Sequence, residues 1–394
     1  MKRATQRLTP DFMKVLFSIS TLILLSACQS TGHVGIDPHT LFYDQGFNGF
    51  EHIPIESQEQ VFELDQDAKD FVTKTVGYID DPIDGMETLI HKIFDRSQYN
   101  LLYKGSANTT ASQTFQNRAA NCLSMSIMTY ALATEAGYDV RFQDIDIPEY
   151  WTRRGGYNLL NGHVNLQLLP KPDLHTMYFQ TIGYQVDFDP QTSKINFPKK
   201  FISKQLVLAM FYNNKGADAL LNKNYKQAYA YFREALILAP EFDSAWVNLG
   251  FLYRLGGFYQ QAEDAYTYAL LIKPDSLTAW ENLAFLYAFI DRQQEAEEIL
   301  AKVERKRMSN PYYHLNLGEQ EFEHENYAEA LRHYRKALSL DKTRHEIYFG
   351  LAKTYYQLGA VERSQHYLKQ AKRKSVSQQQ QDKYQGKLNL LSSL

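Results

Sequence analysis

The chain has few of the residues that build metal or phosphate sites. It contains only two cysteines in 394 residues, Cys28 and Cys122, and no pair of histidines at metal-ligand spacing. It also lacks a glycine-rich phosphate loop. Zinc sites and loops that cradle phosphate therefore have no support in the sequence. The formal net charge of -3 gives no broadly basic surface, which argues against binding driven by nucleic-acid phosphates. We expect no metal, no cofactor and no nucleic-acid partner.

The chain begins with a basic segment followed by a short apolar run. The run VLFSISTLILLSA is 13 residues long, too short to span a bilayer as a helix. The residues before it include four basic side chains and one acid, Asp11. A positive segment, a short apolar run and small residues at its end are typical of a secretory signal.

The end of this segment, Leu25-Ser26-Ala27-Cys28, resembles the bacterial lipobox. The resemblance implies that residues 1–27 are a lipoprotein signal peptide and that Cys28 is acylated. Acyl chains bury CH₂ groups in the membrane, and more than one chain is needed for stable attachment. Residue 29 is Gln rather than Asp, which by analogy with lipoprotein sorting favours the bacterial outer membrane. We expect a lipid-anchored protein that faces the periplasm.

A chain of this length predicts two or three domains. Residues 28–57 show no sustained hydrophobic period, so we expect them to form a tether. Residues 58–204 predict an α+β domain, with helical periodicity from 58 to 76, from 82 to 94 and from 122 to 136. Alternating segments follow in YDVRFQDID, NGHVNLQLL and GYQVDFD, which predict three strands.

From about residue 205 to 376 the chain repeats with a period of 34. Small residues recur in register with large ones. One series of small residues is Gly216, Gly250, Ala284, Gly318 and Ala352. Small residues suit the close approach of two paired helices, and the large ones fill the gap to the next pair. The period resembles the tetratricopeptide (TPR) pattern, which implies five helix pairs starting near 209, 243, 277, 311 and 345. The segment 377–394 predicts a capping helix or a tail.

Cys122 opens the apolar segment CLSMSIMTYALATEA. If Cys28 is lipidated, Cys122 has no disulfide partner in the chain, so it is a core residue or a reactive thiol unless the chain dimerises through it. A helix start favours the negative charge of a thiolate. His163 and Asp187 lie on the following strand candidates and could serve as a base and as a group that orients it.

These segments resemble the transglutaminase-like branch of the papain-fold superfamily, over roughly residues 60–200. The resemblance implies that Cys122 is the nucleophile, His163 the base and Asp187 the orienting acid, with Asp189 as the alternative acid. It also implies a side-chain donor for the oxyanion shortly before the cysteine, for which Gln116 and Gln113 are candidates. Such a site forms a thioester with the acyl group of an amide.

Two functions fit the whole chain. One is a cysteine-dependent enzyme acting on amide bonds of peptides or proteins, with hydrolysis favoured over cross-linking. The other is a non-catalytic TPR scaffold lipoprotein of an envelope assembly. In both, the groove of the repeats binds a protein or peptide partner.

Overall fold

The structure is a computed structural model that describes residues 35–94, 101–170, 183–188, 197–376 and 378–392. The chain divides into two units, residues 1–42 and 43–394. In the first unit the described residues hold one short 3₁₀ helix, η1 (Pro38–Leu41), which the Asp37 side chain caps by accepting a hydrogen bond from the His39 backbone N–H at 2.9 Å. No helix of the described residues is long and apolar enough to cross a membrane.

The second unit begins with short helices that precede a sheet. They are η2 (Asp44–Phe47), η3 (Phe50–His52), α2 (Gln58–Phe62), α3 (Gln66–Val76), α4 (Pro82–Phe94), α5 (Ala111–Asn117) and α6 (Cys122–Glu135). The expected continuous helix from 58 to 76 is two helices, because Asp65 caps a new one by accepting from the Ala68 N–H at 2.8 Å. Residues 43–57 differ from the expected tether, since their aromatic residues pack on the repeats. Phe47, for instance, stacks on Tyr229 with ring centroids 4.3 Å apart.

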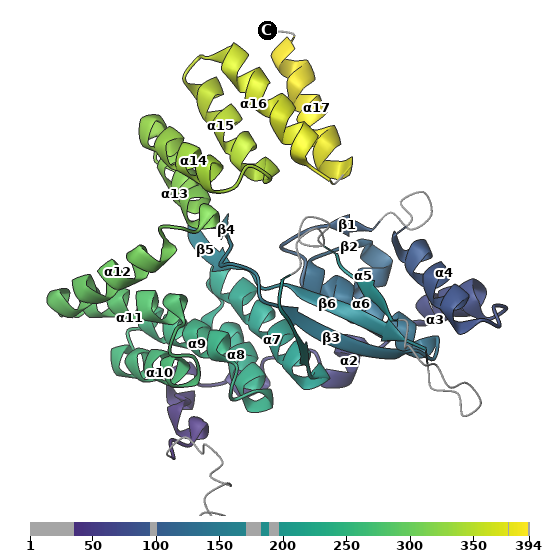
Figure 1. Ribbon diagram of the computed structural model, residues 1–394. Helices are drawn as coiled ribbons and strands as arrows, with labels where there is room; N and C mark the ends of the chain where they lie inside the picture. The colour runs from purple at the N-terminus through teal and green to yellow at the C-terminus, as the bar shows by residue number, and fades with distance from the viewer. Residues whose placement is uncertain (1–34, 95–100, 171–182, 189–196, 377, 393–394) are drawn as a thin grey trace, which may run out of the picture. The chain divides into compact units, whose positions relative to one another are not determined.

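The central sheet has four antiparallel strands in the order β7-β6-β3-β8. The strands of the unit are β1 (Leu102–Tyr103), β2 (Ala119–Ala120), β3 (Asp139–Ile145), β4 (Trp151–Arg154), β5 (Tyr157–Leu160), β6 (Val164–Leu169), β7 (Tyr184–Val186) and β8 (Lys199–Ile202). The expected strands correspond to β3, β6 and β7. Helix α6 packs on β3 and β6 (Figure 1), and it is buried on nearly every side because it is apolar all round.

Strands β4 and β5 form a separate hairpin, residues 151–160, which we call the groove hairpin. Gly155 and Gly156 form its turn with φ of +59° and +83°. A two-residue turn with both residues at positive φ matches the twist of a β-hairpin, and glycine adopts these angles without a steric penalty. Along the chain, the groove hairpin lies between β3 and β6.

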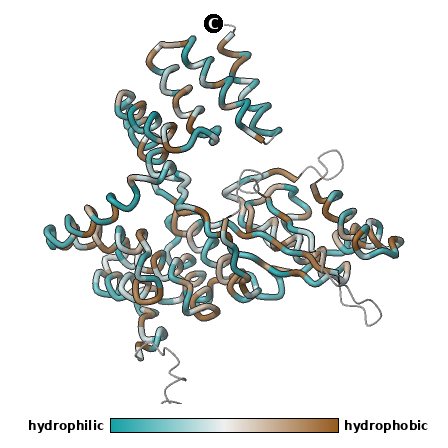
Figure 2. The backbone as a smooth tube through the Cα atoms, in the orientation of Figure 1, coloured by the Kyte–Doolittle hydropathy of each residue, from teal (hydrophilic) through white to brown (hydrophobic). Residues whose placement is uncertain are grey.

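From residue 204 to 392, all the regular secondary structure of the described residues is helical. The helices are α7 (Lys204–Leu221), α8 (Tyr225–Leu238), α9 (Asp243–Leu255), α10 (Tyr259–Ile272), α11 (Leu277–Phe289), α12 (Gln293–Arg307), α13 (Pro311–Glu323), α14 (Tyr327–Leu340), α15 (His345–Gln357), α16 (Val361–Lys374) and α17 (Gln378–Ser392). In Figure 2 hydrophobic and hydrophilic positions alternate along these helices, as expected for helices with one buried face.

The recurring small residues hold the helix pairs together. A Cβ atom at Gly216, Gly250 or Gly318 would lie only 2.6 to 2.7 Å from the aromatic ring at position 232, 266 or 334 of the partner helix. Only a glycine leaves room for these rings, so the periodic pattern follows from packing. The last helix, α17, buries Tyr384 and Leu388 against α15 and α16 and so covers the end of the repeats.

Candidate functional site

Cys122 is the first residue of α6. Asn121 precedes it as the N-cap, and its side chain accepts a hydrogen bond from the Ser124 N–H at 2.9 Å. The helix is otherwise anchored in the core, where the Ser126 hydroxyl donates to the Val164 carbonyl at 3.1 Å. The sulfur of Cys122 is therefore held at the positive end of a buried helix.

His163 and Asp187 lie beside Cys122, although the three residues are far apart in the sequence. His163 directly precedes β6 and Asp187 directly follows β7, so the pairing of these two strands brings them together. The His163 Nε2 atom lies 2.8 Å from the Asp187 Oδ1 atom. The side chain of Cys122 lies close enough to His163 to influence the pKa of the imidazole. Because Nε2 faces Asp187, Nδ1 is the ring nitrogen left for the thiol.

The surroundings of His163 favour its charged form. Its ring is only 3% exposed, and burial alone would lower the pKa of His163. The hydrogen bonds and charges of Asp187 and Cys122 act in the opposite direction and raise the pKa of His163 to about 10. The imidazole is thus prepared to hold a proton beside the carboxylate of Asp187.

Asn165 is a further member of this cluster. It lies on β6, two residues after His163, and its Nδ2 atom donates to Asp187 Oδ2 at 3.1 Å. Each oxygen of Asp187 therefore has a partner. The period-2 alternation of a strand puts positions 163 and 165 on the same side, and this is the signal by which the sequence identifies Asn165.

The two oxyanion candidates lie elsewhere. Gln113 takes part in a capping box with Thr110 at the start of α5, and the Gln116 Nε2 atom donates to Asp65 Oδ2 at 2.6 Å. Neither residue is among those that line the cavity around Cys122. Asp189 and Cys28 lie outside the described residues.

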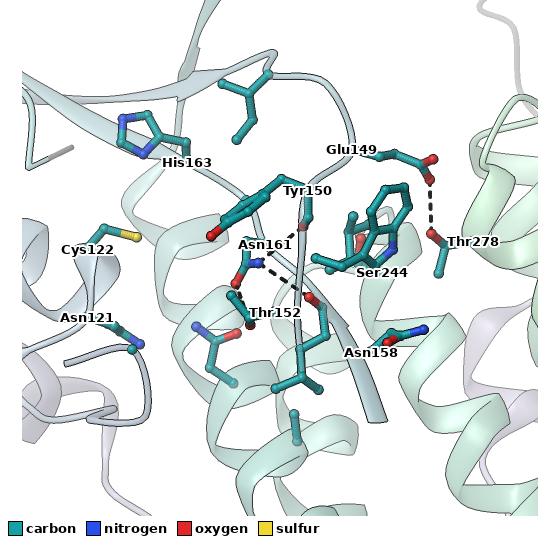
Figure 3. A pocket seen from close by; sticks show the side chains of 18 of the residues that line it. Asn121, Cys122, Glu149, Tyr150, Thr152, Asn158, Asn161, His163, Ser244 and Thr278 are labelled. Carbon is teal, nitrogen blue, oxygen red and sulfur yellow. Dashed lines mark hydrogen bonds between the residues drawn. The ribbon is translucent and has the colours of Figure 1, made fainter. Parts of the chain in front are cut away.

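Cys122, His163 and Asp187 line a cavity of about 1810 Å³ that extends to the repeats. In Figure 3 the side chains of Cys122 and His163 lie on one side of this cavity, and Glu149 lies on the other side next to Thr278 of α11. Thr152 of the groove hairpin lies between these two sides, and Asn158 lies on the side of Glu149. The cavity is therefore shared between the sheet region and the face of the repeats that lines it.

The groove hairpin and the residues just before it dock on that face. Arg307, only 2% exposed, donates to Glu149 from Nε at 2.8 Å and to Glu281 from Nη1 at 2.7 Å. Trp151 is buried in the cluster of Tyr312, Leu315 and Tyr334 and also lines the cavity. Three further contacts join the hairpin to other repeats. Arg154 pairs with Asp218 of the first repeat, the Tyr157 ring contacts Phe251 of the second, and Arg153 pairs with Glu323 of the fourth.

This docking was not anticipated from the sequence. The alternation around Gly155-Gly156 is typical of a hairpin, and it is the one local signal for it. Partners such as Glu149 and Arg307 are 158 residues apart and share no motif.

The arrangement of Cys122, His163 and Asp187 contains the parts that thiol chemistry on a carbonyl requires, namely a sulfur, a base and a group that orients the base. Within the described residues, no cluster of three or more His, Cys, Asp or Glu side chains could hold a metal ion.

The comparisons with known proteins concern the repeats. A family model described as TPR repeat matches residues 318–359. No curated protein matches the chain. Among solved structures, the chain is similar to one described as "Functional Characterization of Pseudomonas Aeruginosa pilF", with 18% identity over 44% of this chain and 80% of that chain and a TM-score of 0.27.

Two other similar structures are a MamA protein and YrrB. MamA is 18% identical over 42% of this chain and 91% of that chain, with a TM-score of 0.24. YrrB, described as a TPR protein with an unusual peptide-binding site, is 17% identical over 44% of this chain and 89% of that chain, with a TM-score of 0.24. The helices of the C-terminal region thus form a TPR solenoid, a type of structure used for protein–protein interaction.

Proposed function

We propose that this protein is a cysteine-dependent enzyme that cleaves amide bonds of a peptide or protein. The observation that carries the proposal is the contact of one buried imidazole, His163, with both Cys122 and Asp187. The arrangement resembles the transglutaminase-like site expected from the sequence. The TPR repeats supply the protein-binding part of the same molecule.

The proposed reaction proceeds through a thioester. The thiolate of Cys122 attacks the carbonyl carbon of the amide, and its proton resides on His163 Nδ1. His163 then gives that proton to the leaving amine as the C–N bond breaks, and Asp187 keeps the ring oriented throughout. A water molecule, deprotonated by His163, hydrolyses the thioester and restores the thiol. The backbone N–H of Cys122 at the start of α6 is a donor for the oxyanion.

Covalent labelling of the full chain tests this proposal. A thiol-directed acylating probe, located by mass spectrometry, should modify Cys122 in the wild type and should label His163→Ala much more slowly. Labelling at equal rates in both proteins would contradict the proposed roles. The matched control is Gln116→Ala, which removes an exposed amide bound to Asp65 and should label like the wild type.

A second function is favoured by the match of the repeats to the TPR family model. In this alternative the protein is a non-catalytic scaffold, and the sheet region serves to present the repeats. It predicts that Cys122→Ala leaves both partner capture and the cellular phenotype unchanged. A loss of either in this variant would exclude it.

We also propose that the protein is anchored to the outer membrane through Cys28 and faces the periplasm, as the lipobox-like segment implies. Metabolic labelling with a fatty-acid analogue should mark the wild type and fail to mark Cys28→Ser. Equal labelling of the two would contradict the anchor.

A further inference from the structure

The carboxylate of Asp218 lies on α7, the first helix of the repeats, yet it contacts the segment that precedes Cys122. One of its oxygens, Oδ2, accepts a hydrogen bond from the Asn108 side-chain amide, and the other, Oδ1, accepts from Arg154 of the groove hairpin. We infer that Asp218 is a positioning residue for Cys122, so that the repeats complete the reactive site as well as bind a partner. This inference rests on the proposed function.

A short chain of hydrogen bonds leads from Asp218 to the nucleophile. The Asn108 side-chain oxygen accepts from the Asn121 side-chain amide, and the Asn121 oxygen accepts from the Ser124 N–H as the cap of α6. The backbone of the same loop is also tied to the helix, since the Thr109 N–H donates to the Ser124 hydroxyl at 2.9 Å. Cys122 therefore lies between two residues, 121 and 124, that this chain fixes.

The direction of the bonds in the chain is fixed at both ends, because Asp218 can only accept and the Ser124 N–H can only donate. A carboxylate can only accept hydrogen bonds, whereas an asparagine side chain can turn over and exchange its donor with its acceptor. Because Asp218 accepts, Asn108 must present its amide nitrogen there and its oxygen to Asn121. The Ser124 N–H requires the oxygen of Asn121, which is the orientation that caps the helix, so the Asp218 end supports the orientation that the helix end requires.

The other oxygen of Asp218, Oδ1, binds the hairpin that leads along the chain to His163. Arg154 ends β4, and the paired strand β5 leads to His163 through Asn161 and Gly162. Asn161 is held in turn, because its Nδ2 atom donates to the Tyr150 carbonyl at 3.1 Å. One carboxylate thus connects the loop before the nucleophile with the hairpin before the base.

If Asp218 had only a structural role, its removal would lower the stability of the fold more than the reactivity of Cys122. The Asp218 side chain is 25% exposed and that of Arg154 is 33% exposed, and ion pairs so close to solvent contribute little to stability. We therefore expect its removal to disturb the reactivity of Cys122 more than the stability of the fold.

The experiment compares Asp218→Asn with the wild type in the full chain. The readouts are kcat and KM for a short fluorogenic peptide amide and the rate of alkylation of Cys122 by iodoacetamide. With asparagine at position 218, no carboxylate holds the direction of Asn108, which can turn over and lose its hydrogen bond with Asn121, the cap of α6. We expect kcat and the alkylation rate to fall about 10-fold, since small misplacements of reacting groups carry large losses of rate, with KM within about 2-fold.

Rescue comes from exchanging the two partners. Asn108→Asp combined with Asp218→Asn moves the carboxylate from position 218 to position 108, next to Asn121, where it can only accept, and should restore most of kcat and of the alkylation rate. The matched control is Glu323→Gln, which removes the ion pair of Arg153 with the fourth repeat but leaves the Asn108 chain untouched. It should behave like the wild type.

The outcomes separate the two proposals. If the wild type cleaves no peptide amide, the proposed function fails, but the alkylation rates still decide the role of Asp218. Equal alkylation and turnover in Asp218→Asn and the wild type would overturn the inference. So would a double variant that folds but stays as slow as the single one. Should Asp218→Asn fail to fold, the double variant alone decides.

Discussion

The repeats and the sheet region are held together by different kinds of contact. In the repeats, each close contact recurs every 34 residues, as Gly216 under Phe232 and Gly250 under Tyr266 show. In the sheet region the important contacts occur once each, such as His163 with Asp187, and they join residues that no period relates. Stability is therefore spread over many equivalent positions in the repeats, whereas reactivity depends on single atoms.

The largest expected effect is the loss of reactivity at one sulfur. Cys122→Ala should lower amide cleavage at least about 10³-fold, because the nucleophile is removed while the rest of the site stays in place. Turnover of a peptide amide is the measurement, with the unfolding midpoint as a control. Residual activity within 10-fold of the wild type would show that the reaction does not use Cys122.

The second prediction concerns the pH dependence of stability. The pKa of His163 is raised to about 10 in the folded chain, above the ordinary value near 6.5. The folded state therefore binds more protons than the unfolded state between about pH 6.5 and pH 10. The stabilisation is complete below pH 6.5 and is lost as the pH rises toward 10, with a slope of at most about 1.4 kcal/mol per pH unit.

Chemical denaturation of the wild type and of Asp187→Asn at several pH values measures this slope. The variant should show a flatter dependence between pH 6.5 and 10, because its amide gives the imidazolium no opposite charge. Parallel curves for the two proteins would mean that Asp187 does not hold the proton on His163.

The third prediction tests the repeated contact. Gly250→Leu puts a side chain where a Cβ alone would lie 2.7 Å from the Tyr266 ring, and overpacking of this kind costs about 3 kcal/mol. Gly386→Ala in α17 is the control, since nothing lies within 4 Å of a Cβ there, and it should stabilise the helix by about 0.5 to 1 kcal/mol. Thermal unfolding compares the two, and equal midpoints would contradict the packing account.

The smallest expected effect concerns the docking of the groove hairpin. Arg307→Ala leaves Glu149 and Glu281 without their shared cation and should cost about 2 kcal/mol, as for hydrogen bonds to charged groups. Arg332→Ala removes an exposed pair with Glu329 and should cost less than about 1 kcal/mol. If urea denaturation gives the same loss of unfolding free energy for both variants, Arg307 does not stabilise the docking of the hairpin.

The two regions also differ in how far the sequence alone describes them. The helix pairs follow from a period that every copy repeats, and the contact of His163 with Asp187 follows from strands that alternate. The docking of Glu149, Tyr150 and Trp151 on the repeats could not be predicted, because it pairs residues that share no spacing. The side chains of Gln113 and Gln116 were assigned by their distance from Cys122 along the chain, but Thr110 binds Gln113 and the distant Asp65 binds Gln116 instead.

The groove hairpin has a consequence for how the solenoid unfolds. A repeat array normally behaves as a one-dimensional stack, in which each unit couples only to its neighbours and the ends can fray independently. Here one segment, residues 149–157, touches the first, second, third and fourth repeats through Asp218, Phe251, Arg307 and Glu323. Such a crosslink couples units that are not adjacent, so these four repeats should melt in a single cooperative transition while α15, α16 and α17 can unfold separately.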